Sequence, residues 1–163
     1  MAAPGETLTP GAQVQRFLAR YTPDVRKTAL TACAALRRLF PGATELVYDN
    51  YNALVIGFGP NDRPSDAWFS VVLYPRYVRL FWLDGAALDD PDGLLEGQGN
   101  RVRSLRLDPD AGIVSAPAVQ SLLKRAVATS DAPYNPKARR RLIIRSVSAK
   151  RRPRRVPSSS IAR

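Results

Sequence analysis

The sequence predicts an α+β domain in which helices cover one face of an antiparallel sheet. Two runs rich in β-branched and aromatic residues, 67–74 and 77–83, are separated by only two residues, which is the pattern of a β-hairpin. The second run alternates, so that Val78, Leu80 and Trp82 share one face. A hairpin alone is marginally stable in water, so further strands and amphipathic helices must cover this apolar surface.

Two amphipathic helices are predicted before the first strand. Thr9-Pro10 and Thr22-Pro23 each place a capping side chain before a proline at the first helical position. Apolar residues then recur at spacings of three and four. The first stripe consists of Val14, Phe17, Leu18 and Tyr21, and the second of Val25, Ala29, Cys33, Leu36 and Phe40. Pro41-Gly42 ends the second helix.

The remaining elements complete the predicted sheet. Four strand candidates, at 44–48, 52–58, 67–74 and 77–83, favour a meander in which neighbours pair antiparallel. Residues 101–107 predict a fifth strand. A last helix, capped by Ser115, follows it. Its apolar stripe consists of Val119, Leu122, Leu123, Ala126 and Val127. We therefore expect two N-terminal helices and one C-terminal helix packed on an antiparallel sheet of about five strands.

Charge divides the chain into a neutral body and a basic tail. The net charge is +11, yet the residues through Asp131 contain 14 basic and 14 acidic side chains, whereas the rest contain 11 basic ones and no acid. We expect a disordered N-terminus at 1–8, a folded domain at 9–131 and a basic, largely disordered tail at 132–163. From Lys150 onward the tail has nothing to bury and should be disordered. The sequence leaves open whether the segment Leu142 to Ile144 docks on the domain.

The composition disfavours several classes of protein. The chain has no histidine and one cysteine, so it lacks the commonest general base and can form neither an internal disulfide nor a cysteine zinc cluster. Cys33 lies on an apolar stripe, which indicates a buried, inert thiol. No secretory leader and no apolar run long enough to span a membrane is evident. These residues favour a cytoplasmic protein without catalytic activity.

The arginine-rich tail is the clearest functional feature. Its cations can neutralise phosphates, although such contacts position a nucleic acid and do not read its sequence. The candidate nucleic-acid-binding residues are Lys137, Arg139, Arg140, Arg141, Arg145, Lys150, Arg151, Arg152, Arg154 and Arg155. The alternative interpretation is a solubilising extension.

The polar loop at 89–100 offers two further candidate sites. Oxygen-rich clusters suit hard cations, and four carboxylates lie within eight residues of each other. These candidate metal ligands are Asp89, Asp90, Asp92 and Glu96. Three glycines followed by Arg101 and Arg103 can instead form an anion-binding nest. The simplest alternative is a solvated loop whose glycines serve turn geometry.

Two runs of the sequence resemble a known family. Phe-Pro-Gly-Ala-Thr-Glu-Leu-Val-Tyr at 40–48 and Leu-Asp-Asp-Pro-Asp-Gly-Leu-Leu-Glu-Gly-Gln-Gly-Asn-Arg-Val-Arg at 88–103 are similar to segments of the YdhG-like family of small bacterial domains of unknown function. The resemblance extends from about Val14 to Val127 and implies a frataxin-like shape. Some relatives are described as iron chaperones, so the resemblance also implies iron binding, which in frataxin-like proteins uses an acidic helix and sheet edge. In this sequence the concentrated ligands are instead the loop carboxylates.

Three functional hypotheses follow. The first is a small non-catalytic binding domain whose arginine-rich tail binds nucleic acid or another polyanion without sequence preference. The second is a frataxin-like iron-binding chaperone. The third is a small-molecule-binding or enzymatic module with a pocket between sheet and helices, such as a cleft lined by Tyr48, Tyr51 and Trp82. The sequence is silent on oligomeric state and on the natural ligand.

Overall fold

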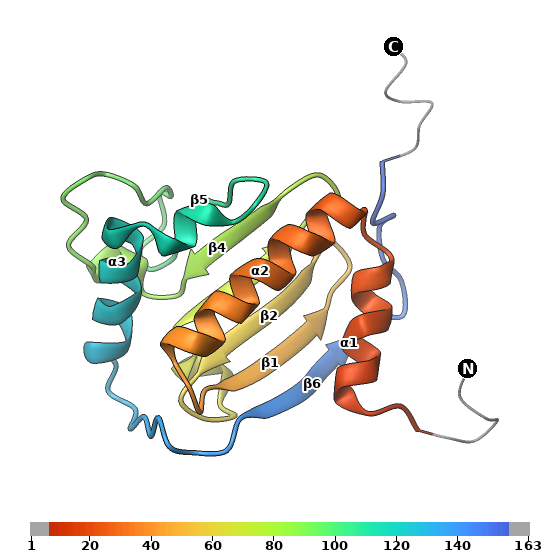
Figure 1. Ribbon diagram of the computed structural model, residues 1–163, viewed down its shortest axis with the longest axis horizontal. Helices are drawn as coiled ribbons and strands as arrows, with labels where there is room; N and C mark the ends of the chain where they lie inside the picture. Colours follow the sequence, from red (N-terminus) through yellow and green to blue (C-terminus); the bar gives the residue numbers. More distant parts are fainter. Residues whose placement is uncertain (1–6, 157–163) are drawn as a thin grey trace, which may run out of the picture.

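In the computed structural model, which describes residues 7–156, three helices pack on a six-stranded sheet (Figure 1). The helices are α1 (Pro10–Ala19), α2 (Pro23–Leu39) and α3 (Pro117–Ala128). The strands are β1 (Thr44–Asp49), β2 (Leu54–Gly59), β3 (Phe69–Leu73), β4 (Val78–Trp82), β5 (Arg103–Arg106) and β6 (Arg141–Val147). Short 3-10 turns occur at η1 (Pro64–Asp66), η2 (Gly85–Ala87) and η3 (Gly112–Ser115). The predicted α+β class is confirmed. None of the described helices is long and apolar enough to cross a membrane.

The two N-terminal helices begin where their caps predict. Thr9 Oγ1 accepts a hydrogen bond from the Ala12 amide, and Thr22 Oγ1 accepts one from the Val25 amide. The third helix differs from its prediction, because Ser115 belongs to η3 and Ala116 is the cap, without a side-chain hydrogen bond. Proline explains the shift, since its ring favours the first helical position and keeps the preceding residue extended.

The sheet has the order β5-β4-β3-β2-β1-β6. Strands β1 to β5 form the predicted antiparallel meander. The sixth strand is new, and it pairs parallel to β1 with Val47 opposite Ile144. The sheet therefore has six strands and is mixed, whereas about five antiparallel strands were expected. After α3 the chain runs past the ends of the central strands to reach the far edge, where β6 lies beside α1 (Figure 1).

The tail that we expected to be largely disordered is part of the fold as far as Val156. Leu142 and Ile144 of β6 pack against the core, so the docking that the sequence left open does occur. The expectation that nothing is buried beyond Lys150 is wrong, because Arg154 is only 4% exposed. Residues 1–6 and 157–163, where disorder was also expected, lie outside the described part of the chain.

The turn between α2 and β1 helps to hold the segment that leads to β6. Gly42 has a φ of 80°, and a Cβ atom there would lie 2.7 Å from the carbonyl oxygen of Asn135. Only glycine satisfies both constraints. In addition, the Tyr134 hydroxyl donates a hydrogen bond of 2.6 Å to the carbonyl of Pro41. This close contact directs the chain toward the edge of the sheet beside β1.

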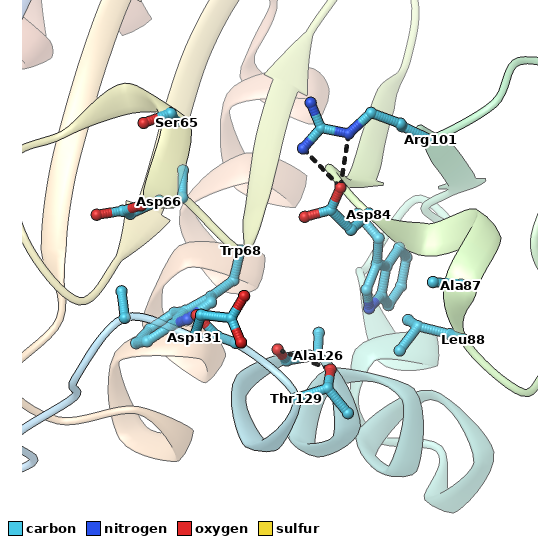
Figure 2. A pocket seen from close by; sticks show the side chains of 14 residues that line it. Ser65, Asp66, Trp68, Asp84, Ala87, Leu88, Arg101, Ala126, Thr129 and Asp131 are labelled. Atoms are coloured by element: carbon cyan, nitrogen blue, oxygen red, sulfur yellow. Dashed lines mark hydrogen bonds and ion pairs between the residues drawn. The ribbon is translucent and has the colours of Figure 1, made fainter.

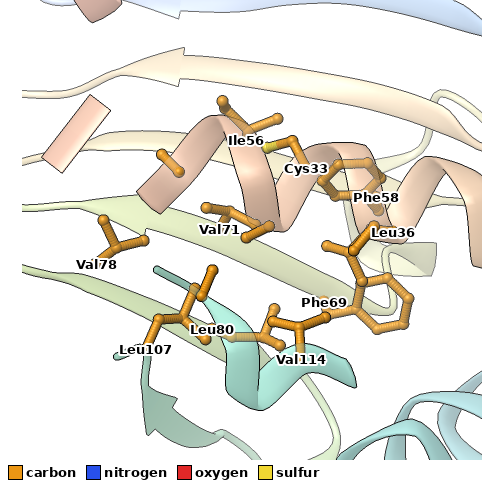
Figure 3. Packing of buried hydrophobic residues seen from close by; sticks show 14 of the residues in the cluster. Cys33, Leu36, Ile56, Phe58, Phe69, Val71, Val78, Leu80, Leu107 and Val114 are labelled. Carbon is orange, nitrogen blue, oxygen red and sulfur yellow. The ribbon is translucent and has the colours of Figure 1, made fainter. Parts of the chain in front are cut away.

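The apolar core lies between α2 and the sheet. Cys33 and Leu36 of α2 face Ile56, Phe58 and Phe69 of the central strands (Figure 3). Cys33 is 1% exposed, which confirms the prediction of a buried cysteine, and burial raises the pKa of its thiol to about 12. The C-terminal turn of α3 lies close to the start of β3 and the end of β4, which are adjacent because the two strands are antiparallel (Figure 2).

Candidate functional site

Two carboxylates of β1 are buried beneath the helices. Strand alternation places Glu45 and Asp49 on the same face as Val47, and both are 1% exposed. Buried charges require partners, because the loss of hydration is otherwise uncompensated. Glu45 receives two hydrogen bonds from Arg37 of α2, at 2.7 and 3.0 Å, and one of 2.5 Å from Arg140. The segment before β6 is thus ion-paired to β1.

Asp49 is surrounded by three arginines from both ends of the chain. Arg20 lies 3.1 Å from its carboxylate, Arg151 lies 3.0 Å away and Arg154 lies 2.9 Å away. Arg154 also donates from its two terminal nitrogens to the carbonyls of Asn50 and Tyr51, whereas its buried Nε has no hydrogen-bond partner. These contacts attach the tail to the end of β1.

Tyr21 lies under this cluster. Its hydroxyl donates to the carbonyl of Leu73 and accepts from the amide of Leu54, and the Arg154 guanidinium lies 5.6 Å from its ring centroid. Burial raises the pKa of Tyr21 to about 12. Arg155 completes the attachment by donating to the carbonyls of three residues that end α1, where cations are favoured.

The candidate nucleic-acid-binding residues therefore divide into two groups. Four of them form ion pairs with carboxylates: Arg140, Arg141, Arg151 and Arg154. Six have no carboxylate partner in the described part of the chain: Lys137, Arg139, Arg145, Lys150, Arg152 and Arg155. All six are exposed, although Arg152 stacks over the Tyr51 ring at 5.7 Å and Arg155 binds α1. They lie on β6 and its two flanking segments.

Three of the four loop carboxylates proposed as metal ligands contact different partners, and the fourth, Asp92, is exposed without a partner in the described residues. Asp89 lies 3.5 Å from Arg125, and Glu96 lies 2.8 Å from Arg79. Asp90 accepts hydrogen bonds from the amides of Leu94 and Leu95. Over residues 7–156 no group of three or more acidic, cysteine or histidine side chains is arranged to hold a metal ion. The expected metal centre is therefore not assembled in this loop.

The anion-binding nest is not assembled either. Arg101 pairs with Asp84 at 2.6 Å. Arg103 donates to the carbonyls of Gly99 and Val102, so its guanidinium closes the loop instead of facing an open site. Both arginines are occupied by the loop itself.

A cavity of about 450 Å³ lies where α3 meets the ends of β3 and β4 (Figure 2). Its walls include Trp68, Trp82, Asp84 and Asp131, and the last turn of α3 closes one side. Of the cleft expected from sequence, only Trp82 lies here. Tyr51 instead lies in the turn between β1 and β2, where the Arg152 guanidinium is 5.7 Å from its ring centroid. Trp68 and Asp131, which form this cavity with Trp82, were not predicted from the sequence.

Sequence reasoning also missed Glu45 and Asp49. The available signal was an acid on either side of Val47 at inward positions of a strand, in a chain whose tail contains ten basic residues before Val156. No family model, curated protein or solved structure matches this chain. The resemblance to the YdhG-like family therefore stays an expectation from the sequence.

Proposed function

We propose that the protein is a small binding domain whose β6 edge holds the phosphate backbone of nucleic acid without sequence preference. The supporting observation is the group of exposed cations on β6 and its flanking segments that lack a carboxylate partner in the described residues. Over residues 7–156, the ten tail cations face three carboxylates, those of Glu45, Asp49 and Asp62. The edge consequently carries an excess of positive charge, which attracts polyanions.

Because the tail is folded as far as Val156, the conformational entropy lost on binding should be smaller than for a disordered tail. A disordered tail loses conformational freedom when it binds, whereas cations on a strand and its flanks are already positioned. Arg145 lies on β6 itself, and Arg139 and Lys150 lie just before and after it. Their guanidinium and ammonium groups can neutralise backbone phosphates. This arrangement supports backbone binding with little discrimination between sequences.

The structural alternative is protection of an open edge. Charged side chains on an edge strand discourage pairing with a second sheet, so arginines on β6 have a use without any ligand. Binding measurements distinguish the two interpretations, because edge protection predicts no affinity for nucleic acid near physiological salt.

The experiment uses fluorescence anisotropy of a labelled DNA duplex with the full chain at several salt concentrations. We expect a dissociation constant between about 1 and 100 μM near physiological salt, and equal affinity for unrelated sequences. Replacing Arg139, Arg145 and Lys150 by serine should lower the log-log salt slope by up to about 3, since each lost phosphate contact removes about 0.9.

A matched variant controls for net charge. Lys27, Arg76 and Lys124 are also exposed and form no ion pair in the described structure, but they lie on α2, the β3–β4 turn and α3. Changing these three residues to serine removes the same charge and should reduce the affinity much less. Equal losses in both triple variants would show that only net charge matters, and no binding by the parent protein would reject the proposal.

A further inference from the structure

The cavity at the α3 end of the sheet is lined by several separate segments. They are η1, the residue before β3, the last residue of β4, the loop after β4, and the C-terminal turn of α3. Its volume of about 450 Å³ is typical of small-molecule sites. We infer that this cavity binds a small organic cation that also carries a hydrogen-bond acceptor.

Two unsatisfied donors support the acceptor on the ligand. Trp68 is 4% exposed and Trp82 is 1% exposed, and neither indole nitrogen has a hydrogen-bond partner. Buried polar groups in native proteins nearly always have partners, so each exception needs a reason. In the described residues two further exceptions are the Nε atoms of Arg151 and Arg154 beside Asp49, whereas both indole nitrogens belong to side chains that line one cavity. An acceptor that reaches either indole N–H would supply the missing bond.

The rings themselves are held firmly, so the donors are kept in place for a ligand. Trp68 makes an edge-to-face contact with Tyr134, at 4.9 Å between centroids, and a tilted contact with Phe40 at 5.9 Å. Trp82 is the last residue of β4 and pairs with Phe69 in the sheet. Preorganised groups lose little freedom when a ligand binds.

The charges around the cavity support a cation. Asp66, Asp84 and Asp131 line it, against one arginine, Arg101, which pairs with Asp84 (Figure 2). Asp66 is held by Arg63 at 3.7 Å, whereas Asp131 has no cationic partner within residues 7–156. Asp131 is therefore the carboxylate that a ligand cation can pair with.

The end of α3 adds to this negative field. Thr129 and Ser130 line the cavity directly after the helix, where the last backbone carbonyls carry partial negative charge. The protein as a whole has a net charge of +11, so this negative site is a local exception. It favours organic cations and disfavours the polyanions proposed for the β6 edge, so the two proposals stand independently.

The two tryptophans provide the test. They are the only tryptophans of the chain, so a ¹⁵N-labelled full-length sample gives two indole N–H signals in an NMR spectrum. L-Argininamide serves as the probe because it carries a guanidinium, an ammonium and a carbonyl acceptor. We expect saturable downfield shifts of at least one indole signal, with a millimolar or lower dissociation constant.

Variants and a second probe make the result specific. Asp131→Asn should weaken argininamide binding about tenfold, because it removes one charge-assisted contact. Asp92→Asn is the matched control, since Asp92 is exposed and does not line this cavity, and it should leave the affinity unchanged. Succinate should not shift the indole signals. The inference is overturned by the absence of saturable shifts with argininamide, by equal affinity of the Asp131→Asn variant, or by equal shifts with succinate.

Discussion

Asp49 is the residue on which the attachment of the tail depends. Its buried carboxylate faces Arg20, Arg151 and Arg154, and Arg154 is itself almost fully buried. The net stabilisation from such a buried cluster is small, because the desolvation of the charges offsets much of their mutual attraction. Removing one member of the cluster is strongly destabilising, since it leaves the remaining charges buried without a counter-charge.

Asp49→Asn should therefore destabilise the protein strongly. We expect the free energy of unfolding to fall by about 3 to 5 kcal/mol, because the buried Arg154 guanidinium loses its counter-charge. Urea denaturation followed by tryptophan fluorescence measures the change. Asp92→Asn is a matched control with an expected effect within about 0.5 kcal/mol, as for ordinary surface changes. A small effect at Asp49 would mean that the cluster contributes little to the fold.

Two buried groups that can lose a proton predict how the free energy of unfolding changes at alkaline pH. Burial raises the pKa of the Cys33 thiol and of the Tyr21 hydroxyl to about 12. When the chain unfolds, these groups ionise at lower pH, so the unfolded state loses protons that the folded state keeps. Stability is then fully present below about pH 8.5, where an exposed thiol begins to ionise, and is lost progressively as the pH rises toward about 12.

The contribution of the thiol can be measured separately. Cys33→Ala should give a flatter decline in the free energy of unfolding between about pH 8.5 and pH 11 than the parent chain. Tyr21 is present in both proteins, so the difference between the two curves reports the thiol. Parallel curves would contradict a raised pKa for Cys33.

At the level of elements, the helices and the meander were predictable because their signals are local. A threonine before a proline, an apolar spacing of three and four, and a short turn between alternating runs each lie within a few residues. Strand β6 depends on parallel pairing with β1, about a hundred residues earlier, and on arginines that pair with Glu45 and Asp49. From composition alone, such arginines are expected to be solvated, and the tail was therefore predicted to be disordered.

We expect the tail beyond β6 to stabilise the fold mainly through its ion pairs with Asp49. A double-mutant cycle tests this dependence. A chain that ends at Lys150 lacks Arg151 and Arg154 and should lose about 2 to 4 kcal/mol of unfolding free energy. In the Asp49→Asn background the same truncation should have a much smaller effect, because the partner is already absent. Urea denaturation of the four proteins gives the coupling. Additive losses would show that the tail is held by other contacts.

At the scale of the whole molecule, charge is arranged by the fold and not only by the sequence. The sequence places all excess positive charge after Asp131, but folding pairs four of the ten described cations there and leaves the other six exposed on β6 and its flanking segments. The acidic cavity could not be read from the chain, because Asp66, Asp84 and Asp131 come from three separate segments. The sequence offered Trp82 as a wall of a candidate cleft but not Trp68, and the unpaired nitrogens of both tryptophans are visible only in three dimensions.

This arrangement predicts two binding sites that act independently. The DNA duplex should bind at Arg145 and Lys150 on the β6 side, whereas argininamide should bind beside Trp82 and Asp131 at the α3 end. Saturating argininamide should then change the duplex affinity of the full chain by less than about twofold, because no charge is shared between the sites. Anisotropy titrations with and without argininamide, at matched ionic strength, measure this. Strong competition would contradict this prediction and show that both ligands use the same surface. The Asp131→Asn variant would then show whether Asp131 belongs to that surface, because its loss should remove the competition.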